Sequence, residues 1–300
     1  MQNAQLLLNP LLHLAIIVPL LLIFMKERTR ENYLRVVTIA FCYFVCYVAL
    51  TLQNYFSCFN IIGGNWNWDG KIYSVICGVT FYFLFRRQFS ENNFFTLKQN
   101  REGVKPALWV AFAIIAAQAL LGSLGNAEFD IERLLFQLSM PGIDEEIMFR
   151  GVLLGLMCSA LRAGGAAWRN PAIIINAVLF GLVHSLSLGD GALQFNSVNF
   201  MWTGLLGYGF GYITIKTRSI LIPMLTHNLY NFLLNTHLYK KLLHQLLKIH
   251  NQNKHIHLLE NCWINQGCCV FGYLFLCKGV SRCLSGHLRG RCFICNPILP

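Results

Sequence analysis

The scarcest feature of this sequence is charge, because only 12% of its 300 residues are Asp, Glu, Lys or Arg. Soluble globular domains carry about 25% charged residues. A water-soluble fold with so few charges would expose large apolar patches, and here 55% of the residues are hydrophobic, with a mean hydropathy of +0.49. The composition therefore argues against an ordinary soluble domain and predicts an integral, multi-pass membrane protein.

Acidic residues are especially few, with 13 Asp and Glu against 24 Lys and Arg, which gives a formal charge of +11. In a soluble protein this excess would suggest nucleic-acid binding. The basic residues here fall mostly between apolar segments, where they set the orientation of membrane helices. We therefore expect the chain to contact the lipid bilayer and not a nucleic acid.

The sequence lacks Ser- or Pro-rich linkers, and it lacks any repeat with a period of about 20–50 residues. No basic residue precedes the first apolar segment and no small-residue cleavage site follows it. That segment is typical of a retained span and not of a signal peptide.

Apolar segments predict an all-α integral membrane fold of about eight transmembrane helices. The basic connections follow the first, third, fifth and seventh segments, which places them on the cytoplasmic side and the N-terminus outside. The segments cover residues 7–25, 35–53, 72–85, 106–122, 131–160, 171–188, 199–215 and 219–236.

The last part of the chain, residues 237–300, is a basic, Cys-rich tail that we expect to be poorly ordered, with a frameshifted end as the alternative. Eight spans would place this tail outside, against the positive-inside rule, so either one span is miscounted or the tail ignores the rule. Cys292 and Cys295 have metal-ligand spacing, but no second such pair stands where a zinc ribbon needs it.

Within one apolar segment stand three acids, Asp144, Glu145 and Glu146, and then Arg150. A charge at the bilayer centre costs on the order of 3 kcal/mol, so these side chains must face the protein interior or a water-filled cavity. Glu146 and Arg150 are spaced i,i+4 and are predicted to pair, while Glu145 points about 100° away toward another partner.

The start of this charged helix is predicted from Pro141 and Gly142, which together indicate a helix break. Asp144, shortly after the break, is then expected to cap the helix that follows.

Two other apolar segments supply polar partners for these acids. His184 stands one turn after Phe180, and His227 and Asn231 share a helix face. The predicted topology places Glu145 and His184 in the outer halves of their spans, at similar depth. A Glu, two His and an Asn are the residue types that acid–base chemistry in a membrane requires. Taken singly, each has a structural alternative, since a buried His often only packs and an Asn can join two helices by a hydrogen bond.

In chain order, three motifs can be written as EExxxR (145–150), FxxxH (180–184) and HxxxN (227–231). This set resembles the CPBP family of intramembrane proteases. The family includes the CAAX prenyl endopeptidases of the Ras-converting enzyme type and bacterial relatives linked to bacteriocin processing and self-immunity. The part of the chain that shows this resemblance and contains the motifs is about residues 105–236.

The resemblance implies a helical membrane core around a polar cavity that is open to water. Residues 1–104 would then be N-terminal transmembrane helices, residues 105–236 the catalytic core and residues 237–300 the tail. The activity would be endopeptidase cleavage of a membrane-associated, prenylated or leader-bearing peptide. The resemblance also suggests a bacterial inner membrane, where the family is most numerous; no oligomeric state is predicted.

The resemblance also assigns roles to individual residues. Glu145 would be the general base that activates a water, with His184 beside it. His227 and Asn231 would stabilise the oxyanion that forms on the peptide carbonyl. The supporting residues would be Glu146, Arg150 and Phe180.

Metal participation is an open alternative, because Glu145, His184 and His227 could bind Zn²⁺ and leave one position for water. The spacing is not HExxH, so we favour a site without a metal or other cofactor. Two further alternatives are a non-catalytic immunity or peptide-binding membrane protein that keeps the motifs, and a proton-coupled transporter. The transporter is the less favoured, because no internal duplication is found.

Overall fold

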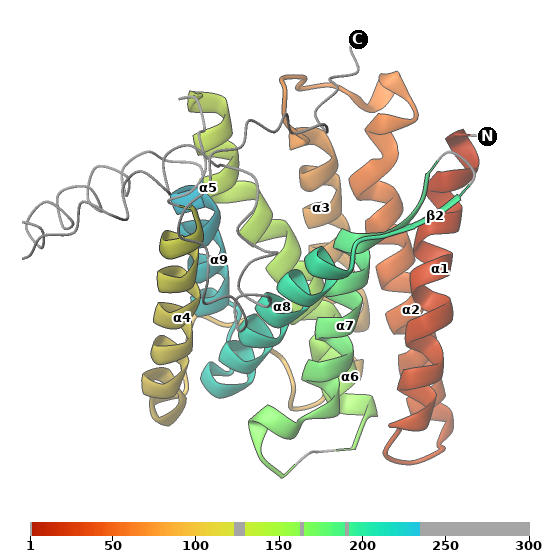
Figure 1. The fold of residues 1–300 in the computed structure, drawn as a ribbon. Coiled ribbons are helices and arrows are strands. Elements are labelled where there is room, and N and C mark those ends of the chain that lie inside the picture. The colour runs from red at the N-terminus through yellow and green to blue at the C-terminus, as the bar shows by residue number, and fades with distance from the viewer. Residues whose placement is uncertain (1, 123–129, 163–164, 190–191, 235–300) are drawn as a thin grey trace, which may run out of the picture. The chain divides into compact units, whose positions relative to one another are not determined.

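The computed structural model describes residues 2–122, 130–162, 165–189 and 192–234, all within one compact unit, Met1–Leu247. The expected poorly ordered tail lies outside these described residues. The described chain is mostly helical (Figure 1).

Each of the eight predicted segments is helical over most of its described length, and three consecutive helical elements together fill the single segment predicted at 131–160. The long helices are α1 (Gln2–Ile23), α2 (Arg30–Thr51), α3 (Trp68–Phe85), α4 (Arg101–Gly122), α5 (Ile131–Glu145), α6 (Leu154–Ala160), α7 (Pro171–Ser185), α8 (Ser197–Thr217) and α9 (Leu221–Leu234). A π-helical segment, η4 (Glu146–Leu153), joins α5 to α6. The short 3-10 helices are η1 (Leu52–Asn54), η2 (Ser57–Phe59), η3 (Arg86–Gln88) and η5 (Ala167–Arg169).

Among the described residues, three helices are long and apolar enough to cross a membrane: Leu6–Ile23, Arg30–Asn54 and Arg101–Leu120. Pro171–Ser185 is a shorter apolar helix. The expected helical, apolar architecture is therefore present, while the number of eight membrane spans stays a prediction.

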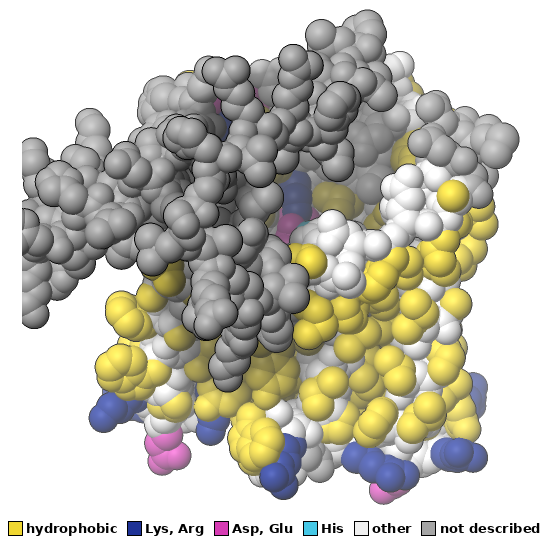
Figure 2. Space-filling view, viewed as in Figure 1, with side chains coloured by type: hydrophobic (Ala, Val, Ile, Leu, Met, Phe, Trp, Pro, Cys, Tyr) yellow, Lys and Arg dark blue, Asp and Glu magenta, His cyan; other side chains and the backbone are white. Residues whose placement is uncertain are grey.

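The connections rich in Lys and Arg lie together at one end of the helices. Figure 2 shows basic side chains along one margin of the molecular face, below a broad apolar surface. Hydrogen bonds join these connections to one another: Lys26 N to Ala160 O (3.1 Å), Arg35 Nε to Gln88 O (3.1 Å) and Asn100 N to Thr217 O (2.8 Å). The basic connections thus share one side of the bundle, as the charge pattern predicts.

The helix break predicted at Pro141–Gly142 is wrong. Helix α5 continues through both residues to Glu145, and η4 follows directly. The N–H of Gly142 donates to Asn228 Oδ1 on α9 at 2.8 Å, so a contact between helices supports the chain next to the proline. Asp144 accordingly caps no helix start; it lies fully buried inside α5.

The segment predicted as a span over residues 171–188 ends earlier, because α7 stops at Ser185 and the chain enters an antiparallel hairpin. Strand β1 (Leu186–Gly189) pairs with β2 (Ala192–Phe195), which corrects the all-α prediction. Helix α1 supports β1, because Asn9 Oδ1 accepts from Leu188 N at 2.8 Å and His13 Nε2 contacts Leu186 O at 2.8 Å. Side chains of α1 therefore satisfy backbone groups that a continuing helix would have bonded internally.

Helices α7 and α8 pack closely through glycines of α8. A Cβ added to Gly207 would lie 3.0 Å from Phe180, and one added to Gly211 would lie 3.1 Å from Ile173. This close approach brings the backbone of α8 next to the motif residue Phe180.

Candidate active site

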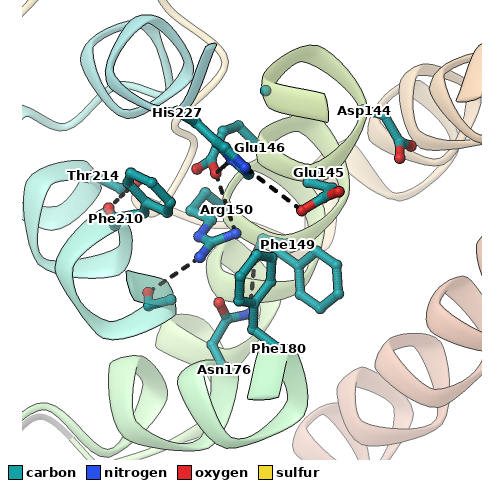
Figure 3. A network of polar contacts seen from close by, with 12 residues as sticks. Asp144, Glu145, Glu146, Phe149, Arg150, Asn176, Phe180, Phe210, Thr214 and His227 are labelled. Carbon is teal, nitrogen blue, oxygen red and sulfur yellow. Dashed lines mark hydrogen bonds and ion pairs between the residues drawn. The ribbon is translucent and has the colours of Figure 1, made fainter. Parts of the chain in front are cut away.

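The structure brings residues from three separate helices to one point. Glu145 ends α5, His184 lies in the last turn of α7, and His227 lies in the middle of α9. Glu145 Oε2 is 3.8 Å from His184 Nε2 and 3.8 Å from His227 Nε2. One carboxylate oxygen therefore faces two imidazoles, and Figure 3 shows Glu145 and His227 pointing toward one another.

The second motif acid, Glu146, lies deeper than Glu145. Its Oε1 accepts a hydrogen bond from His227 Nδ1 at 2.8 Å and forms an ion pair with Arg150 Nη1 at 3.2 Å. Both Glu146 and Arg150 are fully buried. The i,i+4 pair predicted from the sequence is present, and it continues into His227 (Figure 3).

Aromatic rings and a backbone carbonyl enclose the Arg150 guanidinium. Its central carbon lies 4.4 Å from the ring centre of Phe180 and 5.3 Å from that of Phe210. Arg150 Nη2 donates to Gly207 O at 3.2 Å. Cation–π contacts of this kind strengthen when they are shielded from water, so the Phe180 ring is placed to stabilise the buried guanidinium.

The two histidines are held by contacts to their Nδ1 atoms. His184 Nδ1 lies 2.8 Å from Phe180 O, an acceptor only, so this nitrogen carries the proton. His227 Nδ1 is bound to Glu146, and its ring stacks on Phe210 with centroids 4.7 Å apart. Both Nε2 atoms are consequently the ones that face Glu145.

A family model described as Type II CAAX prenyl endopeptidase Rce1-like matches residues 128–233. The resemblance inferred from the motifs is thus confirmed over this stretch, although it begins later than the predicted residue 105. Searches of curated proteins and of solved structures gave no match.

The Rce1-like segment contains every motif residue named from the sequence. The family implies a membrane-embedded protease of the CAAX type that acts on a membrane-associated peptide. Asn231, the last motif residue, lies one turn beyond His227 on α9 and is half-buried.

One charged contact of the site comes from outside the Rce1-like segment. Lys71, in the first turn of α3, donates to Glu145 Oε1 at 2.7 Å and to Asp144 Oδ2 at 2.9 Å. The sequence reasoning missed Lys71, because the third span was taken to begin at residue 72. The available signal was a single Lys in a connection that is otherwise poor in basic residues.

The exposed fraction of the side chains differs across the site. The His184 side chain is 32% exposed and that of Glu145 13%, whereas His227 retains 7%. Figure 2 shows basic and acidic atoms visible in a recess of this face. His184 is therefore the most exposed of the three side chains, whereas Glu146 and Arg150 are fully buried.

Among the described residues, no three or more His, Cys, Asp or Glu side chains are arranged to hold a metal ion. Glu145, the one carboxylate that faces both imidazoles, has the ammonium of Lys71 at 2.7 Å from its other oxygen. A cation beside this carboxylate opposes the binding of a second cation.

Proposed function

We propose that this protein is an intramembrane endopeptidase in which Glu145 activates the water that attacks a peptide carbonyl. The observation that supports the proposal most strongly is the approach of Glu145 Oε2 to two imidazole nitrogens, 3.8 Å from each. Paired acid and imidazole groups at a recess are the arrangement that general acid–base catalysis uses.

The separation of 3.8 Å between Glu145 Oε2 and each Nε2 is longer than a hydrogen bond. At that separation a single water can hydrogen-bond to the carboxylate and to His184 Nε2 together. Glu145 would take a proton from this water as the oxygen attacks the carbonyl. His184, the more exposed imidazole, would lie beside the attacking oxygen and orient it.

The oxyanion would be stabilised from α9. Because His227 Nδ1 is bound to Glu146, His227 can donate from Nε2 only when its ring is protonated on both nitrogens. The amide of Asn231, one turn away, would supply a second donor.

We propose that this chemistry proceeds without a metal ion. Lys71 binds Glu145 Oε1, so that oxygen is already engaged by a cation. Zn²⁺ coordinated by Glu145 and the two histidines is the alternative. Treatment with a chelator separates the two: activity should persist, and a loss that Zn²⁺ restores would refute the metal-free proposal.

The substrate would be a membrane-associated peptide or protein, prenylated or leader-bearing, and the enzyme would be a multi-pass protein of a bacterial inner membrane. The apolar helices and the large exposed hydrophobic side chains on α1, α2 and α4 support a bilayer environment. No protein partner beyond the substrate is proposed.

The test offers fluorogenic peptides, with and without a prenyl group, to the purified protein and to Glu145→Gln. The exposed acid change Glu31→Gln is the control, because the Glu31 side chain is 81% exposed and lies on α2. We expect cleavage by the native protein and by the control, and none by Glu145→Gln. Cleavage that persists in Glu145→Gln would refute the mechanism. Peptide binding without cleavage by the native protein would favour the immunity or peptide-binding alternative.

A further inference from the structure

Lys71 is a buried cation that neither the motifs nor the matched segment includes, and it touches the proposed base directly. Its residue is 8% exposed, and its Nζ lies between two carboxylates, 2.7 Å from Glu145 Oε1 and 2.9 Å from Asp144 Oδ2. An ammonium has three N–H donors. Two of them are therefore directed at adjacent acids on α5.

Helix α3 is held close enough to α5 and η4 for this contact to be fixed. Gly78, on α3, packs against η4, where an added Cβ would lie 2.7 Å from Ile147. At the start of the helix, Trp68 Nε1 donates to Glu132 Oε1 of α5 at 3.1 Å. Contacts on both sides of Lys71 thus tie α3 to the helix that carries the acids.

A glutamate whose carboxylate is to serve as a base needs its orientation fixed. The terminal torsion of a Glu side chain is broad, so rotation readily moves one oxygen away from its target. Lys71 binds Oε1 at hydrogen-bond distance, whereas the two imidazoles stand 3.8 Å from Oε2. The short contact is the one that directs Oε2 toward the histidines.

We propose that Lys71 is a positioning residue that holds Glu145 by Oε1, so that Oε2 faces His184 and His227. This inference rests on the proposed endopeptidase function and extends its site to α3, outside residues 128–233. Asp144 binds the same ammonium at 2.9 Å and so helps to fix its position.

The competing explanation is structural: Lys71 would only neutralise the buried charge of Asp144. Two variants separate the explanations. Lys71→Met keeps an unbranched side chain but leaves Asp144 buried without its cation. Lys71→Met combined with Asp144→Asn removes both charges of that pair, so a purely structural role predicts recovery of activity to the level of Asp144→Asn alone.

The experiment measures kcat and KM on the cleaved peptide together with thermal unfolding in detergent. We expect the double variant to unfold near the temperature of Asp144→Asn, yet to lose about 10²-fold in kcat with little change in KM, the size of effect that a misplaced catalytic group produces. Lys71→Arg, which can donate to both acids, should recover part of kcat. Lys98→Met, the same change at an exposed Lys, is the matched control.

A second measurement does not depend on cleavage. In protein labelled with ¹⁵N-histidine, the ring signals of His184 and His227 should differ between Asp144→Asn and the double variant, because Oε2 is no longer held. Equal kcat in these two variants would overturn the positioning role and leave the proposed function intact. If the native protein cleaves no peptide, the proposed function fails, and unchanged ring signals would then overturn the Lys71 proposal as well.

Discussion

Replacing Glu146 by Gln should cost far more stability than replacing Glu31 by Gln, although each acid precedes an Arg by four residues. Glu146 and Arg150 are both fully buried, with 3.2 Å between Oε1 and Nη1. Removing one partner of such a pair typically costs about 3–5 kcal/mol, because the other charge stays buried without its counter-ion. The Glu31 side chain is 81% exposed and 3.9 Å from Arg35, so its loss should cost at most about 1 kcal/mol.

The change to Gln removes the charge of residue 146 but keeps an oxygen that can accept a hydrogen bond. A Gln carbonyl at position 146 still accepts from His227 Nδ1, which is 2.8 Å from the present carboxylate. Unfolding in mixed micelles, followed by tryptophan fluorescence, measures the free energy for each variant. Equal costs for Glu146→Gln and Glu31→Gln would refute the claim that burial makes this pair essential.

A double-mutant cycle adds a second check on the same pair. Once Glu146→Gln has removed the anion, Arg150→Met removes a cation that has no counter-ion. The double variant should therefore be more stable than the sum of the two single losses predicts. Strict additivity would show that Glu146 and Arg150 do not interact as the structure indicates.

The remaining predictions concern packing around the site. Gly142→Ala would place a Cβ 2.3 Å from Asn228 Oδ1, so α5 and α9 must separate. We expect this variant to lose about 1–3 kcal/mol of unfolding free energy and to cleave peptide more slowly. The control Gly204→Ala, whose Cβ meets nothing closer than 3.6 Å, should be neutral or stabilising. His13→Phe removes the partner of the buried Tyr43 hydroxyl, 2.6 Å from His13 Nδ1, and should cost about 1–3 kcal/mol. Adding Tyr43→Phe should cost little more, which the same unfolding assay measures.

The part of the site that could be predicted consists of charges and imidazoles in apolar helices. Glu146 and Arg150 had to share a helix face because of their spacing, and the high cost of a charge in lipid required them to face inward. The approach of His184 and His227 to Glu145 was expected from the family resemblance, which rests on three motifs in order along the chain. Local periodicity and the cost of burying charge were sufficient for Glu146 and Arg150.

What could not be predicted depends on contacts between segments far apart in the chain. Lys71 lies 74 positions before Glu145, and no local pattern links a Lys at the edge of an apolar segment to a particular acid. The continuation of α5 through Pro141 depends on Asn228 of α9, 86 positions after Gly142. The hairpin after α7 depends on Asn9 of α1, which bonds to the backbone of Leu188. In each case a tertiary contact overrides the local signal.

The burial of the three consecutive acids gives a reason, independent of the motif, for assigning the reaction to Glu145. Asp144 and Glu146 have fully buried side chains, and Figure 3 shows them on opposite sides of their helix. Each is paired with a cation, Asp144 with Lys71 from α3, which also binds Glu145, and Glu146 with Arg150 one turn along the chain. Glu145 lies between them, with its side chain 13% exposed and facing the imidazoles. Because a base must reach the proton it removes, the proposed role of base falls to Glu145, the one acid of the run whose side chain is not fully buried.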